Sequence, residues 1–287
     1  MAVLACSIDG VSQDAATFPP LARASQYGDG LFETIAIISS QPLFWQEHLA
    51  RLRHGAAILG ISVPEDTVLA RYWQRLQANL PGGVVPGRLV LKILLVRSEG
   101  QGYATPKESI GQLLFLLQDW PERPAAYWQE GIRAGLSTVP LQCGAPYLAL
   151  KSLNRLNQIL ARRALTELWQ EAVLCDLEGF LREGIQSNLL WRHGDALYTP
   201  DLHDGGISGI QLGAILRQAE EWGFSVKIVR ETPDALHQAE EILFCNSLIG
   251  SWPVQQWQDR GLPGAAGTLA QRLSAWQRGL GLFPEAL

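Results

Sequence analysis

Apolar residues recur with two different spacings along the first half of the chain. Spacings of three and four residues predict helices at residues 47–59 and 66–80, with Asp66 as the N-cap of the second. Three apolar runs predict strands, at residues 31–38, 88–96 and 112–117. The last two runs are apolar nearly throughout, which indicates strands buried on both faces.

The second half of the chain shows the same mixture of spacings. Two helices are predicted at residues 152–169 and 209–222, and Gly223 ends the second of them. Four strands are predicted, at residues 131–139, 172–181, 224–229 and 240–245, the second of these with a turn at Glu178 and Gly179. Both halves therefore combine α and β elements.

Residues 119–130 interrupt this pattern. Two prolines and three charged residues occur within Asp119–Pro124, a composition typical of a linker. We therefore predict a smaller N-terminal α/β domain at residues 1–118 and a larger C-terminal α/β domain at residues 131–287. Lys151 falls in the second of these domains.

Composition limits the class of protein. Of the 287 residues, 47% are hydrophobic and 18% are charged, which supports a packed core and excludes a disordered chain. The net charge of -5 argues against a nucleic-acid surface, which is normally basic. The four cysteines lie far apart and form no CxxC pair, so neither a metal site nor a disulfide framework is expected.

The hydropathy of the chain favours a protein outside the membrane. The N-terminus lacks the basic segment and long apolar stretch that make a signal peptide. No apolar run reaches the roughly 20 residues that span a bilayer. We expect a cytoplasmic protein whose partner is a small molecule.

Lys151 has an unusual setting for a charged residue. It follows the mostly apolar run Tyr147–Leu150 and precedes a predicted helix. An ammonium group among apolar neighbours is costly unless it is paired or its pKa falls. A lysine of lowered pKa is a nucleophile that forms a Schiff base with an aldehyde. The alternative is a lysine at a strand end whose ammonium reaches solvent, and Lys151 alone does not decide between the two.

Two later segments would complete a pyridoxal phosphate site. Glu183 would keep a pyridine nitrogen protonated, or else it is a turn carboxylate that pairs with Arg182 or faces solvent. The glycine-rich turn at residues 204–209 leads into a predicted helix, whose first N–H groups suit a phosphate. The alternative for that turn is an ordinary loop with a capping serine.

Three further segments have both a functional and a structural interpretation. Arg51 would bind a phosphate through its forked donors, or lie as a charge on a helix surface. Residues Asn246–Leu248 follow a predicted strand and would donate to a phosphate, and the turn at Tyr27–Thr34 delivers residues into a strand. Both of these segments also fit plain turn chemistry.

Six sequence blocks occur in the order typical of one enzyme family. From about Ala24 to Val254 the chain resembles the fold-type IV pyridoxal phosphate enzymes, also called class IV aminotransferases. This family includes branched-chain aminotransferases, D-amino acid aminotransferases and aminodeoxychorismate lyases. The matching blocks are YGDGLFET at 27–34, EHLARL at 47–52, KSLNRLNQILA at 151–161, EGIQSNLLW at 183–191, GISGI at 206–210 and CNSLIGSWPV at 245–254.

The resemblance implies a fold, a cofactor and roles for residues. The fold is a two-domain α/β fold of the α+β type, with D-amino acid aminotransferase-like architecture and the active site between the domains. The cofactor is pyridoxal 5'-phosphate, with Lys151 as the catalytic Schiff-base lysine and Glu183 as the partner of the pyridine nitrogen. The implied phosphate ligands are Arg51, the backbone of Ile210 and Gln211, and Ser247 with the backbone of Leu248. Gln211 replaces the threonine that is usual in the family's phosphate turn.

Within the family, two blocks resemble the lyases. Residues 151–158 are similar to their KxLNRLxQ pattern, and residues 97–103 are similar to their Arg-Gly-x-Gly-x-Arg-Gly-Tyr loop. The likeness implies substrate contacts from Phe32, Arg97, Gln101 and Tyr103. Gln101 stands where an arginine is common, and Phe32 replaces the tyrosine of D-amino acid aminotransferases, whereas the neighbouring Glu33 is shared with the aminotransferases.

The reaction implied by this likeness is that of a pyridoxal phosphate-dependent 4-amino-4-deoxychorismate lyase, which forms 4-aminobenzoate and pyruvate in folate biosynthesis. The alternative is an aminotransferase that acts on branched-chain or D-amino acids with a 2-oxo acid acceptor. A third class is a cofactor-binding protein without catalysis, in which Lys151 is structural. The family also implies a homodimer. We expect Trp252, Trp257 and Trp276 to serve surface or interface packing.

Overall fold

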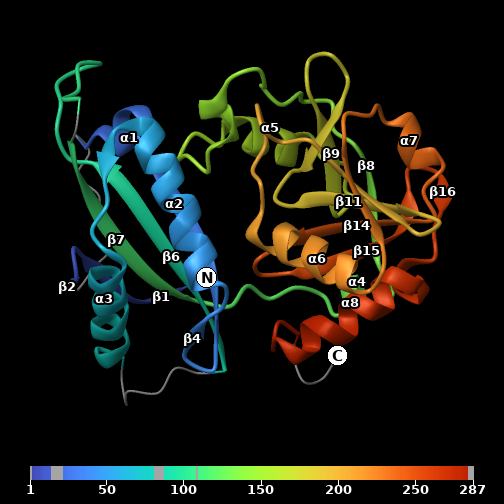
Figure 1. Cartoon of the computed structure of the whole chain (residues 1–287), viewed down its shortest axis with the longest axis horizontal. Helices are drawn as coiled ribbons and strands as arrows, with labels where there is room; N and C mark the ends of the chain where they lie inside the picture. Colours follow the sequence, from blue (N-terminus) through green and yellow to red (C-terminus); the bar gives the residue numbers. More distant parts are fainter. Residues whose placement is uncertain (1, 14–21, 81–86, 108, 284–287) are drawn as a thin grey trace. The chain divides into compact units, whose positions relative to one another are not determined.

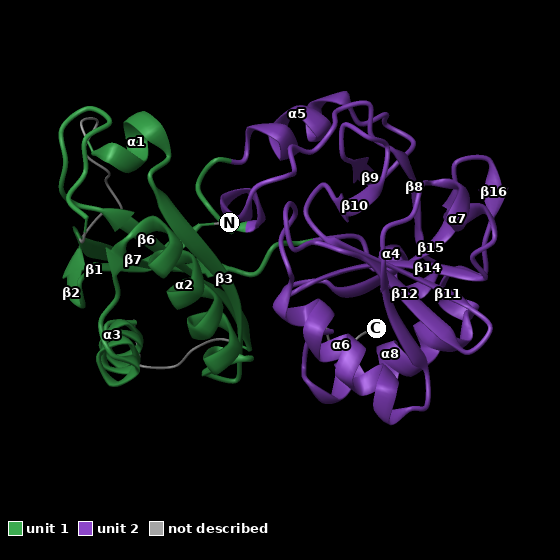
Figure 2. Ribbon diagram, turned by 45° about the horizontal axis from the view of Figure 1, so that its top comes forward, with its two compact units in different colours: residues 1–122, 150–154 green, residues 123–149, 155–287 purple. Residues whose placement is uncertain are grey.

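The computed structural model describes residues 2–13, 22–80, 87–107 and 109–283. Contacts within the chain divide it into two units, which Figure 2 shows in separate colours. Unit 1 holds residues 1–122 and 150–154, and unit 2 holds residues 123–149 and 155–287. The chain first leaves unit 1 inside the segment 119–130, where the sequence predicts a linker.

A mostly antiparallel sheet forms the centre of unit 1 (Figure 1). Its strands follow the order β2-β1-β7-β6-β3-β4, and β5 pairs with β7 in parallel. The bounds are β1 Val3–Ile8, β2 Val11–Gln13, β3 Gly30–Ile38, β4 Gln41–Pro42, β5 Ile61–Ser62, β6 Arg88–Arg97 and β7 Ser109–Asp119. The three predicted strands are confirmed as β3, β6 and β7. Since β6 lies between the other two, its apolar run is buried along most of its length.

Helices of unit 1 bury apolar stripes against this sheet. Besides the short α1 (Arg23–Tyr27), they are α2 (Trp45–Leu59), which contacts β3, and α3 (Asp66–Ala78), which contacts β1 and β7. The buried residues include Leu49, Leu52 and Ala56 of α2 and Leu69, Trp73 and Leu76 of α3. Each buried leucine contributes about 1.5–3 kcal/mol to stability. Asp66 is not the N-cap that we predicted, because its carboxylate pairs with Arg53 and Glu65 precedes the helix.

A segment from later in the chain pairs with β3. The N–H of Phe32 donates to the carbonyl of Lys151 over 2.9 Å, and the N–H of Leu153 donates to the carbonyl of Gly30 over 3.0 Å. These bonds hold residues 150–154 against a strand edge, so two expectations change. Lys151 groups with unit 1 rather than with the C-terminal part of the chain. The helix predicted over residues 152–169 is too long, since α5 spans only Leu156–Ala164.

Unit 2 contains a mixed sheet with the order β10-β9-β8-β15-β14-β11-β12-β13, and β16 pairs with β15. The bounds are β8 Ile132–Leu136, β9 Glu171–Cys175, β10 Leu181–Gly184, β11 Asn188–His193, β12 Ala196–Pro200, β13 Ser225–Val229, β14 Glu241–Asn246, β15 Gly250–Trp257 and β16 Arg260–Gly261. The predicted strands appear as β8, β9, β13 and β14, and the turn at Glu178 and Gly179 separates β9 from β10. Strands β11, β12, β15 and β16 were not predicted from the sequence.

Helices of unit 2 pack on this sheet, with α6 against β13 and β14 and α8 against β14 and β15. The bounds are α4 Ala126–Gln129, η2 Pro146–Ala149, α6 Ile210–Glu221, α7 Asp234–His237, η3 Gly264–Ala266 and α8 Thr268–Gly279. The prediction of a helix at residues 209–222 is confirmed by α6. The predicted linker contains the short helix α4, which contacts β15.

Two of the three tryptophans near the end of the chain lie inside the core of unit 2. Trp252 and Trp257 are each 1% exposed. Trp252 packs edge-on against Tyr127, with ring centroids 5.3 Å apart. The expected surface role is therefore wrong for these two, because β15 lies between β8 and β14 and is covered there. Trp276 is partly buried and meets Trp222.

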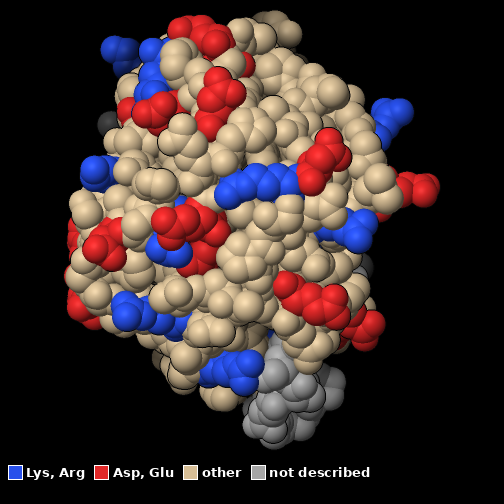
Figure 3. Space-filling view, turned by 90° about the vertical axis from the view of Figure 1, so that its right-hand side faces the viewer, with Lys and Arg blue, Asp and Glu red and all other residues tan. Residues whose placement is uncertain are grey.

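The surface carries charges of both signs. On the face shown in Figure 3, acidic and basic side chains are interspersed among neutral residues, and the described residues form no basic stripe there. Within the described ranges, no helix is long and apolar enough to cross a membrane. The same residues include no cluster of three or more metal-binding side chains.

Candidate active site

Lys151 lies beside the ring of Phe32 in unit 1. Its Nζ is 4.2 Å from the ring centroid, a distance at which the aromatic face attracts an ammonium group. The backbone bond between the same two residues fixes Lys151 against β3. The lysine side chain is therefore held over a predicted substrate residue and is half-buried.

Arg51 on α2 forms a buried cluster with Glu33 and His48. Its Nε and Nη2 donate to the two Glu33 oxygens over 2.8 and 2.6 Å, and His48 Nδ1 lies 2.7 Å from Glu33 Oε2. Burial alone would raise the pKa of Glu33, but the Arg51 charge and the hydrogen bonds from both partners lower it to about 2. Burial lowers the pKa of His48. The two hydrogen bonds to Glu33 fix the orientation of the Arg51 guanidinium, and the Arg51 side chain remains 18% exposed.

Removal of the Glu33 charge should destabilise the protein in a pH-dependent way. Since the pKa of Glu33 falls from 4.5 to about 2 on folding, its contribution is complete above pH 4.5 and is lost as the pH falls towards 2. Glu33→Gln should therefore cost about 3–5 kcal/mol at pH 7, because Arg51 loses its buried partner.

Urea unfolding at pH 7 and at pH 3 measures this effect. The difference in free energy of unfolding between wild type and Glu33→Gln should be smaller at pH 3 than at pH 7. The exposed control Glu65→Gln should match wild type at both pH values. A gap of equal size at both pH values would show that the Glu33 charge adds nothing.

Lys92 is a further candidate, and no sequence pattern pointed to it. Its Nζ lies 5.4 Å from the Phe32 centroid, so two ammonium groups approach one ring. Burial lowers the pKa of Lys92. A β6 residue opposite Thr34 could have been suspected only once the pairing of β3 with β6 was known. Two half-buried ammonium groups near one ring favour an anionic ligand.

The predicted substrate residues of the 97–103 loop differ in position. Arg97 is buried, and its guanidinium donates to Asp29, to Ser109 Oγ and to backbone carbonyls within unit 1. Gln101 is exposed and forms a two-bond bridge with Ala104. Tyr103 is 91% exposed and stacks at a tilt on Tyr27. The structure therefore gives Arg97 a role in holding the loop.

Glu183 lies on β10 in unit 2 and is 4% exposed. Its Oε1 accepts a hydrogen bond from Gln158 Nε2 over 3.2 Å, and its Oε2 accepts one from the N–H of Ile207 over 2.7 Å. Hydrogen bonds donated to a carboxylate favour its ionised form. Glu183 is therefore a fixed buried acid whose neighbours suit a negative charge. Its pairing with Arg182, the structural alternative, does not occur among the described contacts.

The first turn of α6 starts directly after the glycine-rich turn. Gly209 is its N-cap and makes no side-chain capping bond; a Cβ there would lie 1.9 Å from Asn188 Oδ1. Gln211 is fully buried, and both polar atoms of its amide lack a partner within the described part of the chain. A buried amide without partners is costly. The helix start therefore fits an acceptor such as a phosphate, through Ile210, Gln211 and the helix dipole.

Ser247 and Leu248 lie in the turn between β14 and β15. The N–H of Leu248 donates to Asn246 Oδ1 over 2.9 Å, and the N–H of Ile249 donates to the same oxygen. Asn246 thus shapes the turn and takes up the backbone donor that the resemblance assigns to a phosphate. Of the predicted residues in unit 2, Ile210 and Gln211 are adjacent on one helix, and Glu183 is tied to the loop before that helix.

A family model for the class IV amino-transferases matches residues 30–257. The chain belongs to this family of enzymes. An aminodeoxychorismate lyase of Vibrio harveyi is 29% identical over 253 residues, which are 86% of this chain and 89% of that protein. The fold matches solved class IV structures, and the two-domain α+β architecture expected from the resemblance is confirmed.

Two solved structures illustrate the match. The 4-amino-4-deoxychorismate lyase of Pseudomonas aeruginosa is 34% identical, covers 96% of this chain and 98% of its own, and superposes with a TM-score of 0.84. A branched-chain amino acid aminotransferase of Escherichia coli has a TM-score of 0.83 at 22% identity, covering 99% and 97% of the two chains. The second likeness concerns the fold alone.

Proposed function

We propose that this class IV enzyme is a pyridoxal phosphate-dependent 4-amino-4-deoxychorismate lyase, which releases 4-aminobenzoate and pyruvate in folate biosynthesis. The observation that carries this proposal is the 34% identity with a lyase over nearly the whole of both chains. The aminotransferase above reaches similar TM-scores at only 22% identity. Because both folds match this chain about equally well, the higher sequence identity with the lyase favours the lyase over the aminotransferase.

The residues present fit pyridoxal phosphate as cofactor. In unit 2, Glu183 suits the ring nitrogen, and the α6 N-terminus with the unpartnered Gln211 amide suits the phosphate. In unit 1, Lys151 suits the aldehyde, and Arg51 suits the phosphate. Ser247 remains a proposed phosphate ligand, whereas the Leu248 N–H is already bonded to Asn246 Oδ1. When bound, the cofactor supplies an electron sink for the carbon next to the substrate amine.

Residues of this chain have separate roles in the proposed reaction. Lys151 takes the proton from C4 of the substrate and returns a proton to the departing enolpyruvyl group. The bond between the ring carbon and the enolpyruvyl oxygen breaks, so that the oxygen leaves with the pyruvate. The ring becomes aromatic, and the two products together contain every atom of the substrate. Glu183 holds a proton at the pyridine nitrogen. Phe32 packs beside Lys151 and limits where its Nζ points.

Lys92 is proposed to bind a substrate carboxylate. Gln101, which stands where an arginine is common, is uncharged and cannot form such an ion pair. The Lys92→Gln variant should raise KM about tenfold, as expected for one lost charged hydrogen bond, and leave cofactor affinity unchanged. Steady-state kinetics with 4-amino-4-deoxychorismate measure this, with the exposed Lys107→Gln as control. An unchanged KM for Lys92→Gln would remove Lys92 from the substrate site.

The second candidate function is amino-group transfer between an amino acid and a 2-oxo acid. The match to branched-chain aminotransferases in fold supports it, since the same lysine, carboxylate and phosphate ligands serve both reactions. Activity assays with and without an amino acid and a 2-oxo acid distinguish the two functions. A lyase needs neither, whereas an aminotransferase is inactive without them.

We also propose that the enzyme is a cytoplasmic homodimer. An apolar face of α5 is exposed in the single chain: Leu156 is 64% exposed, Ile159 56% and Leu160 39%. Burial of such a face against a second copy would remove it from water. Sedimentation equilibrium measures the mass, and a monomer at micromolar concentration would count against the dimer.

A further inference from the structure

Arg182 occupies a bulge directly before Glu183. Leu181 of β10 faces Cys175 of β9, but Glu183 faces Leu174, so β10 carries one extra residue at Arg182. A bulge redirects a side chain out of the regular alternation of a strand. Arg182 is 4% exposed, so its guanidinium lies inside unit 2 and needs buried partners.

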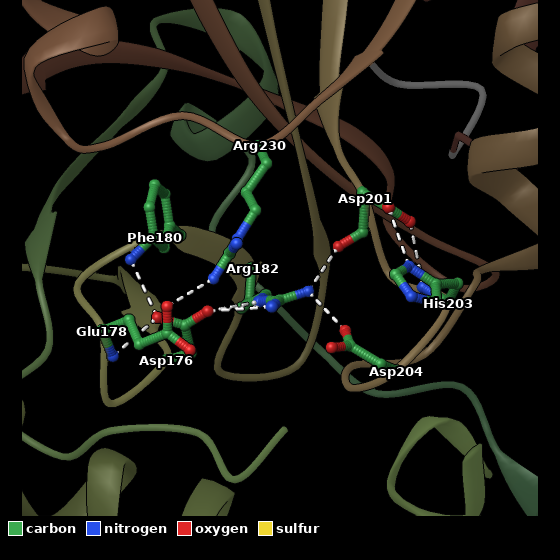
Figure 4. Close-up of polar contacts among 8 residues, drawn as sticks. All are labelled: Asp176, Glu178, Phe180, Arg182, Asp201, His203, Asp204 and Arg230. Atoms are coloured by element: carbon green, nitrogen blue, oxygen red, sulfur yellow. Dashed lines mark hydrogen bonds and ion pairs between the residues drawn. The ribbon is translucent and has the colours of Figure 1, made fainter. Parts of the chain in front are cut away.

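These partners come from two separate turns (Figure 4). Arg182 Nε and Nη2 donate to Asp176 Oδ2 over 3.0 and 2.8 Å. Nη1 donates to Asp204 Oδ1 and to the carbonyl of Asp201, both over 2.8 Å. Asp176 Oδ1 in turn accepts from the N–H groups of Glu178 and Phe180. One side chain therefore links the β9–β10 turn to residues 201–207, here called the 201–207 loop.

The far end of the 201–207 loop touches Glu183 itself. The N–H of Ile207 donates to Glu183 Oε2, and its carbonyl accepts from Asn188 Nδ2 over 2.7 Å. Gly206 has φ +87, and a Cβ there would lie 3.4 Å from Glu183 Oε2. The loop runs on through Gly209 into the first turn of α6. Glu183 and the α6 N-terminus, the proposed phosphate ligand, are thus joined by one loop.

We propose that Arg182 is a positioning residue of the cofactor site: it fixes the 201–207 loop, so that one loop aligns Glu183 and the α6 N-terminus. The forked guanidinium is suited to this because it holds two carboxylates and a carbonyl at once, which a lysine cannot do. The 201–207 loop is further tied at Asp204, whose carbonyl accepts from the N–H of Gly144 over 2.9 Å. This inference rests on the proposed cofactor, but not on the lyase reaction.

Two variants test the proposal, with one matched control. Arg182→Lys keeps the charge and loses the fork. Asp204→Asn weakens only the ion pair between Arg182 and the 201–207 loop. It carries less risk of misfolding than Arg182→Lys, because the Asp204 side chain is 27% exposed. Arg230→Lys is the control, because Arg230 belongs to the same cluster but is half exposed and binds Glu178 at the surface.

The first measurement is amide hydrogen exchange of the protein without cofactor. Peptides that cover residues 201–212 should exchange faster in both variants, and peptides from β14 and α8 should not change. The second is the affinity for pyridoxal 5'-phosphate, which should fall on the order of tenfold. Losses of this size are typical when a residue that orients a directly binding side chain is changed. The third is the pH at which the absorbance of the bound cofactor titrates, which should shift because Glu183 is no longer held.

The control should match wild type in all three. Unchanged exchange at residues 201–212, or exchange raised equally across unit 2, would overturn the positioning role. Unchanged cofactor affinity together with an unchanged titration would also overturn it. A wild-type protein that binds the cofactor but releases no 4-aminobenzoate would refute the lyase and leave this inference standing.

Discussion

Lys151→Ala should abolish turnover of 4-amino-4-deoxychorismate, with a loss on the order of 10⁴-fold or more, since both the nucleophile and the proton carrier disappear. The variant should also lose the absorbance of the covalently held cofactor. The fold should remain, because the backbone bonds that tie this segment to β3 involve no side-chain atom of Lys151. Absorbance spectra and product assays on one preparation measure both effects.

Lys227 provides a matched control for this variant. It also lies over an aromatic ring, with its Nζ 5.6 Å from the Tyr198 centroid, but it belongs to the edge strand β13. Lys227→Ala should keep both the absorbance and the turnover. Residual turnover of more than a few per cent in Lys151→Ala would remove Lys151 from the reaction and favour a structural lysine.

Glu183→Gln should have the second largest effect. The amide keeps the shape of the side chain but offers one oxygen, whereas Glu183 accepts from both Gln158 and Ile207. One buried donor therefore loses its acceptor, and the ring nitrogen loses its negative partner. We expect kcat to fall about 10²–10³-fold, by analogy with the loss of one group that stabilises transition-state charge. The cofactor should still bind.

Stopped-flow kinetics with loaded protein would follow proton removal directly. Glu178→Gln is the control, because Glu178 lies in the adjacent turn and is 71% exposed. A Glu183→Gln enzyme with the wild-type rate would show that the ring nitrogen does not depend on this carboxylate.

Local patterns predicted many of the helices and strands of this chain. The runs that became β3 and β6 and the spacing that became α2 and α6 carry their own signal, because the apolar residues of each are largely buried. β15 was missed since it contains Trp252 and Pro253, and its burial comes from neighbouring strands. The long helix expected after Lys151 failed for a related reason, because backbone bonds to β3 hold its first residues extended.

The candidate site likewise combines residues that the sequence alone indicates with residues that only the tertiary structure brings together. Lys151, Glu183 and Arg51 stand out through sequence blocks in a fixed order. The partners that orient them come from distant positions: Glu33 pairs with Arg51 across 18 residues, and Ile207 donates to Glu183 across 24. Lys92 reaches Phe32 only through the register of β3 with β6. Such contacts depend on tertiary pairing, which spacing along one chain does not reveal.

The proposed reaction is a cleavage that needs one substrate and no second amino acid. The most direct test is to incubate the purified protein, loaded with pyridoxal 5'-phosphate, with 4-amino-4-deoxychorismate alone and to quantify both products. We predict equal amounts of 4-aminobenzoate and pyruvate, and neither with Lys151→Ala. No 4-aminobenzoate from loaded wild-type protein, together with amino-group transfer once an amino acid and a 2-oxo acid are added, would contradict the account and establish the aminotransferase.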